Sequence, residues 1–335
     1  MVLITGGTGF LGSHLIHFLL EKGVHVRALK RDDSSFAVLE RVFRFYGKTF
    51  DDHKQRVEWV NADITDYYSL EDCLANVDQI YHAAACVSFQ PGDNERMQKI
   101  NTQGTANLVN LAVEKKIAKF CHVSSIAAIG RAENDNIIDE NVIWKSSRNN
   151  SNYAISKYGA EREVWRGIEE GLNAVIVNPS IILGPGEINS GSARLIKTVE
   201  KGLKFYTPGI NGFVDVRDVV EIMVRLMDSE ITSERFVVSS ENLDYQTLFR
   251  YIANEINKPE PLYKAGKFLG GVAWRAEYIK SLITRQKPLI TKETSHTANN
   301  MYRYSSEKIQ RALRFTFRPV KQSIHDACDF YLTNS

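Results

Sequence analysis

The sequence has few cysteines, no long apolar segment and almost no net charge, and each shortage excludes a class of protein. Its four cysteines lie far apart without a Cys-x-x-Cys pair, so they form no zinc or iron–sulfur motif. No apolar run approaches the roughly 18 residues that a membrane-spanning helix needs. Lys and Arg total 42 against 40 for Asp and Glu, and the net charge of +2 gives no reason to expect nucleic acid as the main partner.

The N-terminal segment and the composition bear on location and size. The chain begins with apolar residues that have neither the basic region nor the cleavage site of a secretory signal. Unpaired cysteines fit a reducing compartment, so we expect a cytoplasmic protein. Hydrophobic residues make up 43% of the 335 residues and charged residues 24%, which predicts a folded chain with a sizeable core.

Short apolar segments alternate with longer helical patterns over the first half of the chain. We predict strands at residues 2–5, 24–29, 57–61, 79–85, 119–124 and 174–179. We predict helices at residues 11–19, 36–45, 69–74, 101–115 and 153–170, the third capped by Ser69. Such alternation is typical of βαβ units, so the expected fold class is α/β with a doubly wound parallel sheet. Ligands would then bind beyond the carboxyl ends of the strands.

A glycine-rich turn joins the first predicted strand to the first helix. Gly6, Gly9 and Gly12 follow the spacing G-x-x-G-x-x-G. Gly6 lets the chain leave the strand, Gly9 lets backbone approach a pyrophosphate, and Gly12 lets the helix pack closely on the sheet. The free N–H groups and the dipole of the helix would hold the phosphates. The predicted nucleotide contacts are Gly6, Thr8, Gly9, Phe10, Leu11 and Gly12.

The end of the second predicted strand bears on the choice between NAD and NADP. An acidic residue there would bind the ribose 2′-hydroxyl of NAD. The chain has Lys30 and Arg31 instead, and a cation suits the 2′-phosphate of NADP, which we therefore prefer. Asp32 and Asp33 follow directly and could turn inward, and the two cations could be a solvated pair, so NAD remains open.

Three polar residues in the middle of the chain predict acid–base chemistry. Tyr153 and Lys157 lie four residues apart at the start of a predicted helix, so their side chains share one face. A nearby ammonium would favour the phenolate and lower the tyrosine pKa from its ordinary value of about 10. Ser125, next to a predicted strand end, would donate a hydrogen bond to a carbonyl oxygen. The set predicts proton transfer at a carbonyl or alcohol while hydride moves to or from a nicotinamide.

Together, these motifs resemble those of the extended short-chain dehydrogenase/reductases, the NAD-dependent epimerase/dehydratase superfamily. The matching motifs span most of the chain and are Thr5–Gly12, Ala62–Thr65, Tyr81–Ala85, Asn101-x-x-Gly104-Thr105, Val123–Ser125, Tyr153-x-x-x-Lys157, Asn178–Ser180, Gly184–Gly186 and Phe213–Val219. The resemblance implies that Tyr153 is the acid/base, that Lys157 tunes it and binds the ribose, and that Ser125 holds the carbonyl oxygen. Asn101 would fix nearby backbone rather than react. The further implied cofactor contacts are Asp63, Ile64, Ala83, Ala84, Ala85, Val123, Pro179, Ser180 and Ile182, and no metal is expected.

The strand–helix pattern changes after Pro179. Residues 214–216 and 236–238 look like late returns to the sheet. We therefore predict two parts, an NADP-binding Rossmann domain and a smaller, discontinuous α+β substrate lobe. Their expected limits are residues 1–179 plus about 213–240 for the first part, and 180–212 plus about 241–335 for the second.

Within the family, residues 26–32 and 178–180 are similar to the dihydroflavonol 4-reductase and 3β-hydroxysteroid dehydrogenase branch. That resemblance implies hydride transfer between NADP(H) and a small hydrophobic ketone, aldehyde or secondary alcohol. Loops at 87–89, 204–206 and 268–274 are apolar and aromatic, which suits such a substrate, although each aromatic side chain could equally belong to a second-lobe core. The expected substrate contacts are Val87, Phe89, Ser125, Tyr153 and Tyr206.

Two other functions remain open. A nucleotide-sugar epimerase or dehydratase that retains NAD shares the fold, the glycine turn and the Tyr/Lys pair, but it needs cations for the substrate pyrophosphate. The family's usual arginine before the proline is Asn178 here, although Arg194, Lys197 and Lys204 could supply charge. A non-catalytic NADP-binding redox sensor would generally lack the Tyr/Lys pair. Many family members pair their two long helices across a dimer, so a homodimer is also open.

Overall fold

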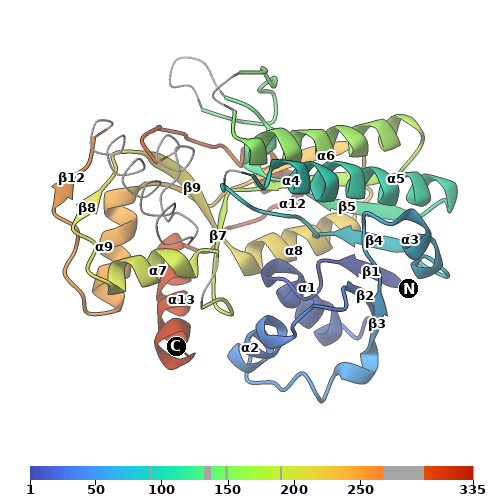
Figure 1. Ribbon diagram of the computed structural model, residues 1–335, viewed down its shortest axis with the longest axis horizontal. Coiled ribbons are helices and arrows are strands. Elements are labelled where there is room, and N and C mark those ends of the chain that lie inside the picture. Colours follow the sequence, from blue (N-terminus) through green and yellow to red (C-terminus); the bar gives the residue numbers. More distant parts are fainter. Residues whose placement is uncertain (91, 132–136, 148–149, 189–190, 267–297, 335) are drawn as a thin grey trace.

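A seven-stranded parallel sheet forms the centre of the molecule (Figure 1). The computed structural model describes residues 1–90, 92–131, 137–147, 150–188, 191–266 and 298–334. Along the sheet the strand order is β10-β6-β5-β4-β1-β2-β3. The bounds are β1 (Val2–Thr5), β2 (Val26–Lys30), β3 (Val57–Asn61), β4 (Gln79–His82), β5 (Lys119–Val123), β6 (Ala174–Pro179) and β10 (Glu234–Val238). The order reverses between β1 and β4, as in a doubly wound fold, so the predicted fold class is confirmed.

Helices cover both faces of this sheet because its strands are apolar on both sides. In β1, Val2 and Ile4 pack into one cluster and Leu3 packs into the other, as expected for side chains that alternate along a strand. The helices of the first face are α1 (Phe10–Glu21), α2 (Ala37–Phe45), α8 (Val216–Met227) and α12 (Glu307–Leu313). Those of the second face are α3 (Tyr67–Cys73), α5 (Gly104–Glu114) and α6 (Asn152–Glu169).

A smaller three-stranded sheet, with the order β11-β9-β7, belongs to a separate apolar cluster. Figure 1 shows its helices, α7, α9 and α13, to the left of the main sheet. The bounds of these elements are β7 (Ile181–Leu183), β9 (Ile210–Asp215), β11 (Glu241–Asp244), α7 (Ala193–Glu200), α9 (Tyr245–Glu255) and α13 (Val320–Asn334). A two-stranded pair consists of β8 (Phe205–Tyr206) and β12 (Tyr263–Lys264).

Residues 214–216 do not return to the main sheet, so that prediction is wrong. Val214 and Asp215 belong to β9, which pairs with β7 and β11, and Val216 already begins α8. A short apolar run indicates a strand but not the strands it pairs with. Residues 236–238 lie in β10 beside β6, as predicted. The proposed division into two domains remains a prediction.

Two helices begin at least two residues earlier than predicted. Asp66 caps α3, since its carboxylate accepts the backbone N–H of Tyr68 at 3.2 Å, and the prediction of Ser69 as the cap is wrong. Aspartate caps as well as serine does, and Asp66 comes first along the chain. The helix expected from residue 101 starts with α4 (Asn94–Met97) and continues through a π-helical turn, η2 (Gln98–Gln103), into α5. The short 3₁₀ turns are η1 (Lys54–Arg56) and η3 (Ile126–Ala128).

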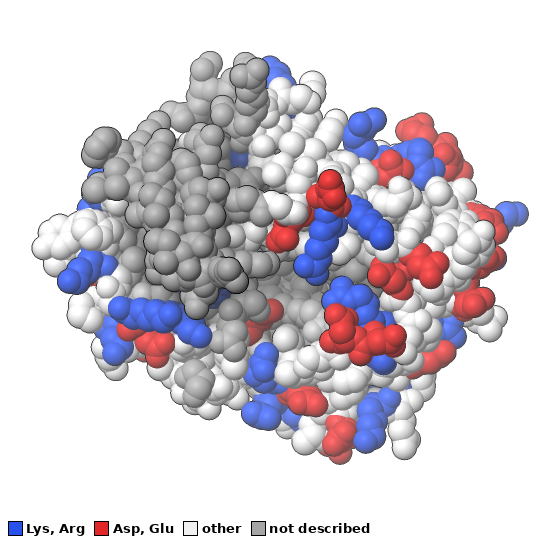
Figure 2. Space-filling view, viewed as in Figure 1, with Lys and Arg blue, Asp and Glu red and all other residues white. Residues whose placement is uncertain are grey.

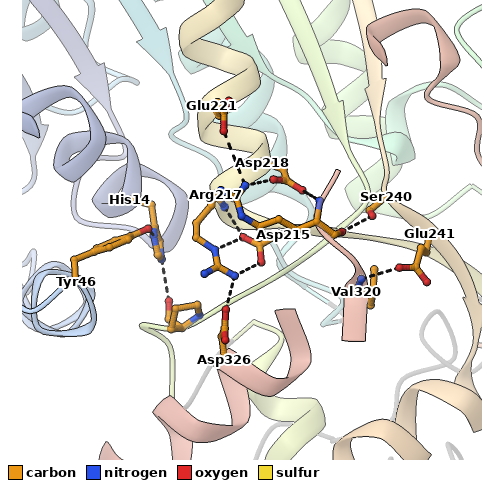
Figure 3. Close-up of polar contacts among 12 residues, drawn as sticks. His14, Tyr46, Asp215, Arg217, Asp218, Glu221, Ser240, Glu241, Val320 and Asp326 are labelled. Atoms are coloured by element: carbon orange, nitrogen blue, oxygen red, sulfur yellow. Dashed lines mark hydrogen bonds and ion pairs between the residues drawn. The ribbon is translucent and has the colours of Figure 1, made fainter. Parts of the chain in front are cut away.

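Buried ion pairs tie α8 to the C-terminal segment (Figure 3). Asp215 caps α8, and both Asp215 and Asp326 of α13 accept hydrogen bonds from the Arg217 guanidinium at 2.6 Å. Asp218 pairs with Arg318 and also accepts its backbone N–H at 2.8 Å. Asp215 and Asp218 are fully buried, so removing Arg217 or Arg318 would leave a buried carboxylate without its cation. These ion pairs therefore connect the apolar cluster that contains α8 to the cluster that contains α13.

The visible surface carries both signs of charge. Figure 2 shows Lys and Arg interspersed with Asp and Glu, without a large patch of one sign among the described residues on that face. In the described part of the chain, no helix is both long and apolar enough to cross a membrane.

Candidate active site

The turn between β1 and α1 and the first turn of α1 each contain a glycine that has no room for a side chain. Gly6 has a φ of +74°, and a Cβ there would lie 2.8 Å from backbone atoms of Ala83 and Ala84. A Cβ at Gly12 would lie 2.1 Å from the Gly6 carbonyl oxygen. The turn is therefore packed tightly against the end of β4, at the point where the strand order reverses.

The N-terminus of α1 is open to an anion. Its N-cap Gly9 is exposed, no side chain caps the helix, and its first turn has no acidic residue. The first N–H groups and the positive end of the helix dipole therefore fit a pyrophosphate. Of the other predicted contacts in this turn, Thr8 and Phe10 are half-buried, whereas Leu11 packs against the core.

The cations after β2 lie at the rim of this region. Lys30 is half-buried, and no ion pair involving it appears among the described residues. Arg31 is exposed and donates to Asp33 at 3.1 Å. An exposed pair of this kind contributes about 0–1 kcal/mol, so a phosphate could displace Asp33 at little cost.

Asp63 and Ile64 follow β3 and face different surroundings. Partial burial raises the pKa of the Asp63 carboxyl, but two hydrogen bonds from Thr65 and the charge of Arg31 outweigh it and hold that pKa below its ordinary value. Ile64 is buried beneath α5, where a Cβ on Gly104 would lie 2.8 Å from it. Asp63 is therefore an accessible anion, and Ile64 is a packing residue next to it.

The three predicted catalytic side chains meet where β5 ends and α6 begins. Ser151 caps α6, its hydroxyl accepting the N–H of Ala154 at 3.0 Å, which places Tyr153 in the first turn. The phenol of Tyr153 lies close enough to the Ser125 side chain for Ser125 to act on its pKa. Lys157 is 2% exposed, and its ammonium donates to the Val123 carbonyl at 2.8 Å.

The protein's own groups do not lower the pKa of Tyr153. Burial raises that pKa, and the neighbouring Ser125 side chain only partly opposes the effect. Lys157 was expected to lower the pKa of Tyr153, but among the described residues it has no such effect. Burial also lowers the pKa of Lys157 to about 8, against the opposing charge of Glu161. Lys157 is thus mainly protonated at neutral pH.

Asn101 fixes backbone, in agreement with the sequence-based interpretation. Its side chain accepts the N–H of Cys86 at 2.7 Å and donates to the Cys86 carbonyl at 2.9 Å. It also donates to Ser156 of α6 at 2.9 Å. The π-helical turn around Asn101 therefore ties the segment after β4 to the helix that carries Tyr153 and Lys157.

Among the predicted substrate contacts outside the catalytic group, Phe89 lies against Tyr153. Its ring lies edge-on to Tyr153, with centroids 5.6 Å apart, and it is 37% exposed. Val87 is 63% exposed nearby in sequence. Tyr206 packs with the cluster of α7, α9 and α13, which favours the core interpretation for that residue. The predicted loop at 268–274 lies outside the described residues.

Most of the remaining predicted cofactor contacts lie at the carboxyl edge of the main sheet. Ala85 is exposed after β4, and Val123 ends β5. Pro179 ends β6, and Ser180 follows it with a buried hydroxyl that has no partner among the described residues. Ile182 lies in β7 and packs against the main core.

His82 is a satisfied strand histidine. Its Nδ1 lies 2.7 Å from the Thr5 hydroxyl, and its Nε2 lies 2.9 Å from the Thr105 hydroxyl. Burial and the charge of Lys157 lower its pKa to about 3, so it is neutral. Within the described residues, no three His, Cys, Asp or Glu side chains come together as metal ligands.

Sequence reasoning missed a buried polar group behind the catalytic residues. Asn178 and Arg235 each donate a hydrogen bond to the Glu161 carboxylate there. The available signal was the spacing of four residues, which continues from Tyr153 and Lys157 to Glu161 on the same helix face. Arg235 had no such signal, since it comes from a distant strand.

A family model described as "NAD dependent epimerase/dehydratase family" matches residues 2–239. Sterol demethylase protein B of Methylococcus capsulatus is 27% identical over 333 residues, covering 98% of this chain and 97% of that protein. A putative dihydroflavonol 4-reductase of Synechocystis is 27% identical and covers 98% of this chain and 93% of its own length. The crystal structure of gox2253 superimposes with a TM-score of 0.83 at 28% identity, covering 100% of this chain and 98% of that one. The resemblance inferred from the motifs is thereby confirmed.

Proposed function

Because the chain belongs to the NAD dependent epimerase/dehydratase family, we propose that it is an NADP-dependent reductase or dehydrogenase of the dihydroflavonol 4-reductase type. It would transfer hydride between NADP(H) and a small, hydrophobic ketone, aldehyde or secondary alcohol. The observation that carries this proposal is the meeting of Ser125, Tyr153 and Lys157 at the carboxyl end of β5. That edge also carries the open turn before α1, where ligands of this fold bind.

The described residues fit a nicotinamide dinucleotide. Two glycines whose Cβ atoms would clash with backbone form a tight turn, and the uncapped start of α1 provides N–H groups for phosphate oxygens. Asp63 and the backbone of residues 83–85 would lie along the dinucleotide. The hydroxyl of Ser180, buried and without a partner among the described residues, would serve the nicotinamide end. When bound, the nicotinamide supplies or accepts the hydride.

The chain's own residues would manage the proton and the substrate oxygen. Ser125 would donate a hydrogen bond to the oxygen. Tyr153 would give its phenolic proton to that oxygen in reduction, or take one from the alcohol in oxidation. Lys157, protonated at neutral pH and buried, would stabilise the phenolate that forms. Phe89, edge-on to Tyr153, would exclude water and contact an apolar substrate.

The charges after β2 support NADP over NAD. Lys30 and Arg31 stand where an acidic residue would bind the ribose of NAD. The weak, exposed pair between Arg31 and Asp33 would open to admit a 2′-phosphate. We also propose a cytoplasmic location, which the free thiols of all four cysteines support.

The test is a titration of the purified protein, after copurified nucleotide has been measured, with NADPH, NADH and UDP-sugars by isothermal calorimetry. We expect NADPH to bind much more tightly than NADH, and UDP-sugars not to bind. A screen of carbonyl compounds then follows the oxidation of NADPH at 340 nm. Tightly retained NAD together with UDP-sugar binding would refute the proposal and favour an epimerase or dehydratase. Binding of NADPH without turnover of any carbonyl compound would favour a redox sensor.

A further inference from the structure

A buried carboxylate lies directly behind the proposed catalytic group. Glu161 is on α6, one helical turn beyond Lys157, and is 2% exposed. One of its oxygens accepts from Arg235 of β10 at 3.0 Å. The other accepts from the Ser124 hydroxyl at 2.6 Å and from the Asn178 amide at 2.7 Å. A helix side chain thus binds three neighbouring strand regions, β5, β6 and β10.

The Asn178 amide extends this contact to the backbone of the proposed carbonyl donor. Its Nδ2 donates a second hydrogen bond, at 3.0 Å, to the carbonyl oxygen of Ser125. Both protons of the amide are therefore used, one on Glu161 and one on Ser125. The backbone at Ser124 and Ser125 is therefore held on both sides. The Ser124 hydroxyl bonds directly to Glu161, and the Ser125 carbonyl is linked to Glu161 through Asn178.

The same carboxylate acts on Lys157. Glu161 raises the pKa of Lys157 and partly offsets the effect of burial. Of the groups that face Lys157 from the sheet, His82 and His122 are buried and have strongly lowered pKa values, so neither adds charge at neutral pH. Arg235 faces Glu161 from β10 and also donates to the Glu140 carbonyl at 2.6 Å.

We propose that Glu161, held by Arg235, is a positioning residue that fixes Ser125. The catalytic part of this inference rests on the proposed function. The claim that Glu161 fixes the Ser125 backbone does not depend on it. A buried ion pair that only stabilised the fold would have no link to the Ser125 backbone. Glu161 has that link through Asn178, and it shares its helix with Tyr153 and Lys157.

The experiment compares three variants with the wild type. Glu161→Gln keeps the shape of the side chain and removes its charge. Asn178→Ala leaves the ion pair intact and cuts the link to Ser125, so it separates the effect of that link from the effect of the Glu161 charge. Glu163→Gln is the matched control on the same helix, since Glu163 is 29% exposed and pairs with Arg166 at 2.9 Å. Each variant is first checked by thermal unfolding.

Two measurements decide the proposal. Amide hydrogen exchange, read by mass spectrometry over residues 124–129, needs no activity and reports how firmly Ser125 is held. The second measurement is kcat and KM against pH with the best carbonyl substrate. We expect exchange to rise and kcat to fall about tenfold in Glu161→Gln and Asn178→Ala, with KM within about twofold. In Glu161→Gln alone, the alkaline limb of the kcat profile should move to lower pH, because the charge that raises the pKa of Lys157 is lost.

Exchange, kcat and pH profile equal to those of the control in both variants would overturn the proposal. Loss of stability with an unchanged kcat in the folded fraction would also overturn it, because the pair would then be purely structural. A wild type that turns over no carbonyl compound would instead refute the proposed function. The exchange measurement would still decide whether Glu161 fixes Ser125.

Discussion

Replacing Gly12 with alanine should destroy the phosphate-binding turn while leaving the rest of the fold in place. The new Cβ would lie 2.1 Å from the Gly6 carbonyl oxygen and 2.9 Å from the Gly7 Cα, where ordinary contacts begin at 3.4 Å. The atoms it meets are backbone, so the turn must move by more than an ångström. That shift would misplace the N–H groups at the start of α1.

The expected loss follows from those hydrogen bonds. A hydrogen bond to a charged group is worth about 1.5–3 kcal/mol, so losing two weakens binding by about 3 kcal/mol or more. That corresponds to a rise of about 100-fold or more in the Kd for NADPH. Fluorescence titration with NADPH measures it, and thermal unfolding shows that the variant is folded. Gly266→Ala is the matched control, because no atom lies within 4 Å of its added Cβ. A wild-type Kd in Gly12→Ala would refute the reasoning.

Three further predictions concern the catalytic proton, the cofactor and pH. Tyr153→Phe should lower kcat by about 10²–10⁴-fold at an unchanged Kd for NADPH, because the phenolic proton is lost. Arg31→Ala should reduce the preference for NADPH over NADH by about tenfold, measured as the ratio of the two Kd values. Acidification from pH 7 to pH 5 should lower the unfolding midpoint. Burial lowers the pKa of His14 and His17 to about 4 and that of His82 to about 3, below the 6.5 of the unfolded chain, so their stabilising contribution is complete above pH 6.5 and decreases as the pH falls.

Each of these has a control and a contrary outcome. Tyr158→Phe removes a hydroxyl from the same helix and keeps the ring stacked on Trp144, so it should leave kcat unchanged. Equal rates for the two tyrosine variants would exclude Tyr153 as the acid/base. An unchanged ratio of Kd values in Arg31→Ala would argue against a 2′-phosphate contact there. An unfolding midpoint that is constant between pH 7 and pH 5 would show that the buried histidines are not neutral in the fold.

Local patterns in the sequence predicted the elements that sit next to one another along the chain. The spacing of Gly6, Gly9 and Gly12 depends on a single strand, turn and helix. In the structure, a Cβ at Gly6 or Gly12 would clash with backbone atoms, which explains why these two positions are glycine. Tyr153 and Lys157 share a helix face because their spacing is nearly one turn. Alternation of short strands with helices was enough to predict the parallel sheet.

Predictions that needed long-range partners were less successful. The apolar run at 214–216 indicated a strand, yet β9 pairs with β7 and β11 in another sheet. Tyr206 is aromatic and lies in an apolar loop, a pattern that suits a pocket and a core equally, and it packs with the core cluster of α7, α9 and α13. In both cases the deciding contact comes from residues that are distant in sequence.

The cation that pairs with Glu161 comes from a strand that is distant in sequence, so the local motif could not predict it. The motif before the proline has Asn178 where the family usually has arginine, which leaves Glu161 without a cation from β6. Because β10 lies beside β6, Arg235 pairs in register with Ile176 and reaches Glu161 at 3.0 Å. The neutral amide of Asn178 then bridges Glu161 and the Ser125 carbonyl. A lysine or arginine at this position would place a positive charge there instead. An Asn178→Arg variant would therefore crowd Arg235 with a second buried cation, and it should destabilise the fold even though it restores the family's usual residue.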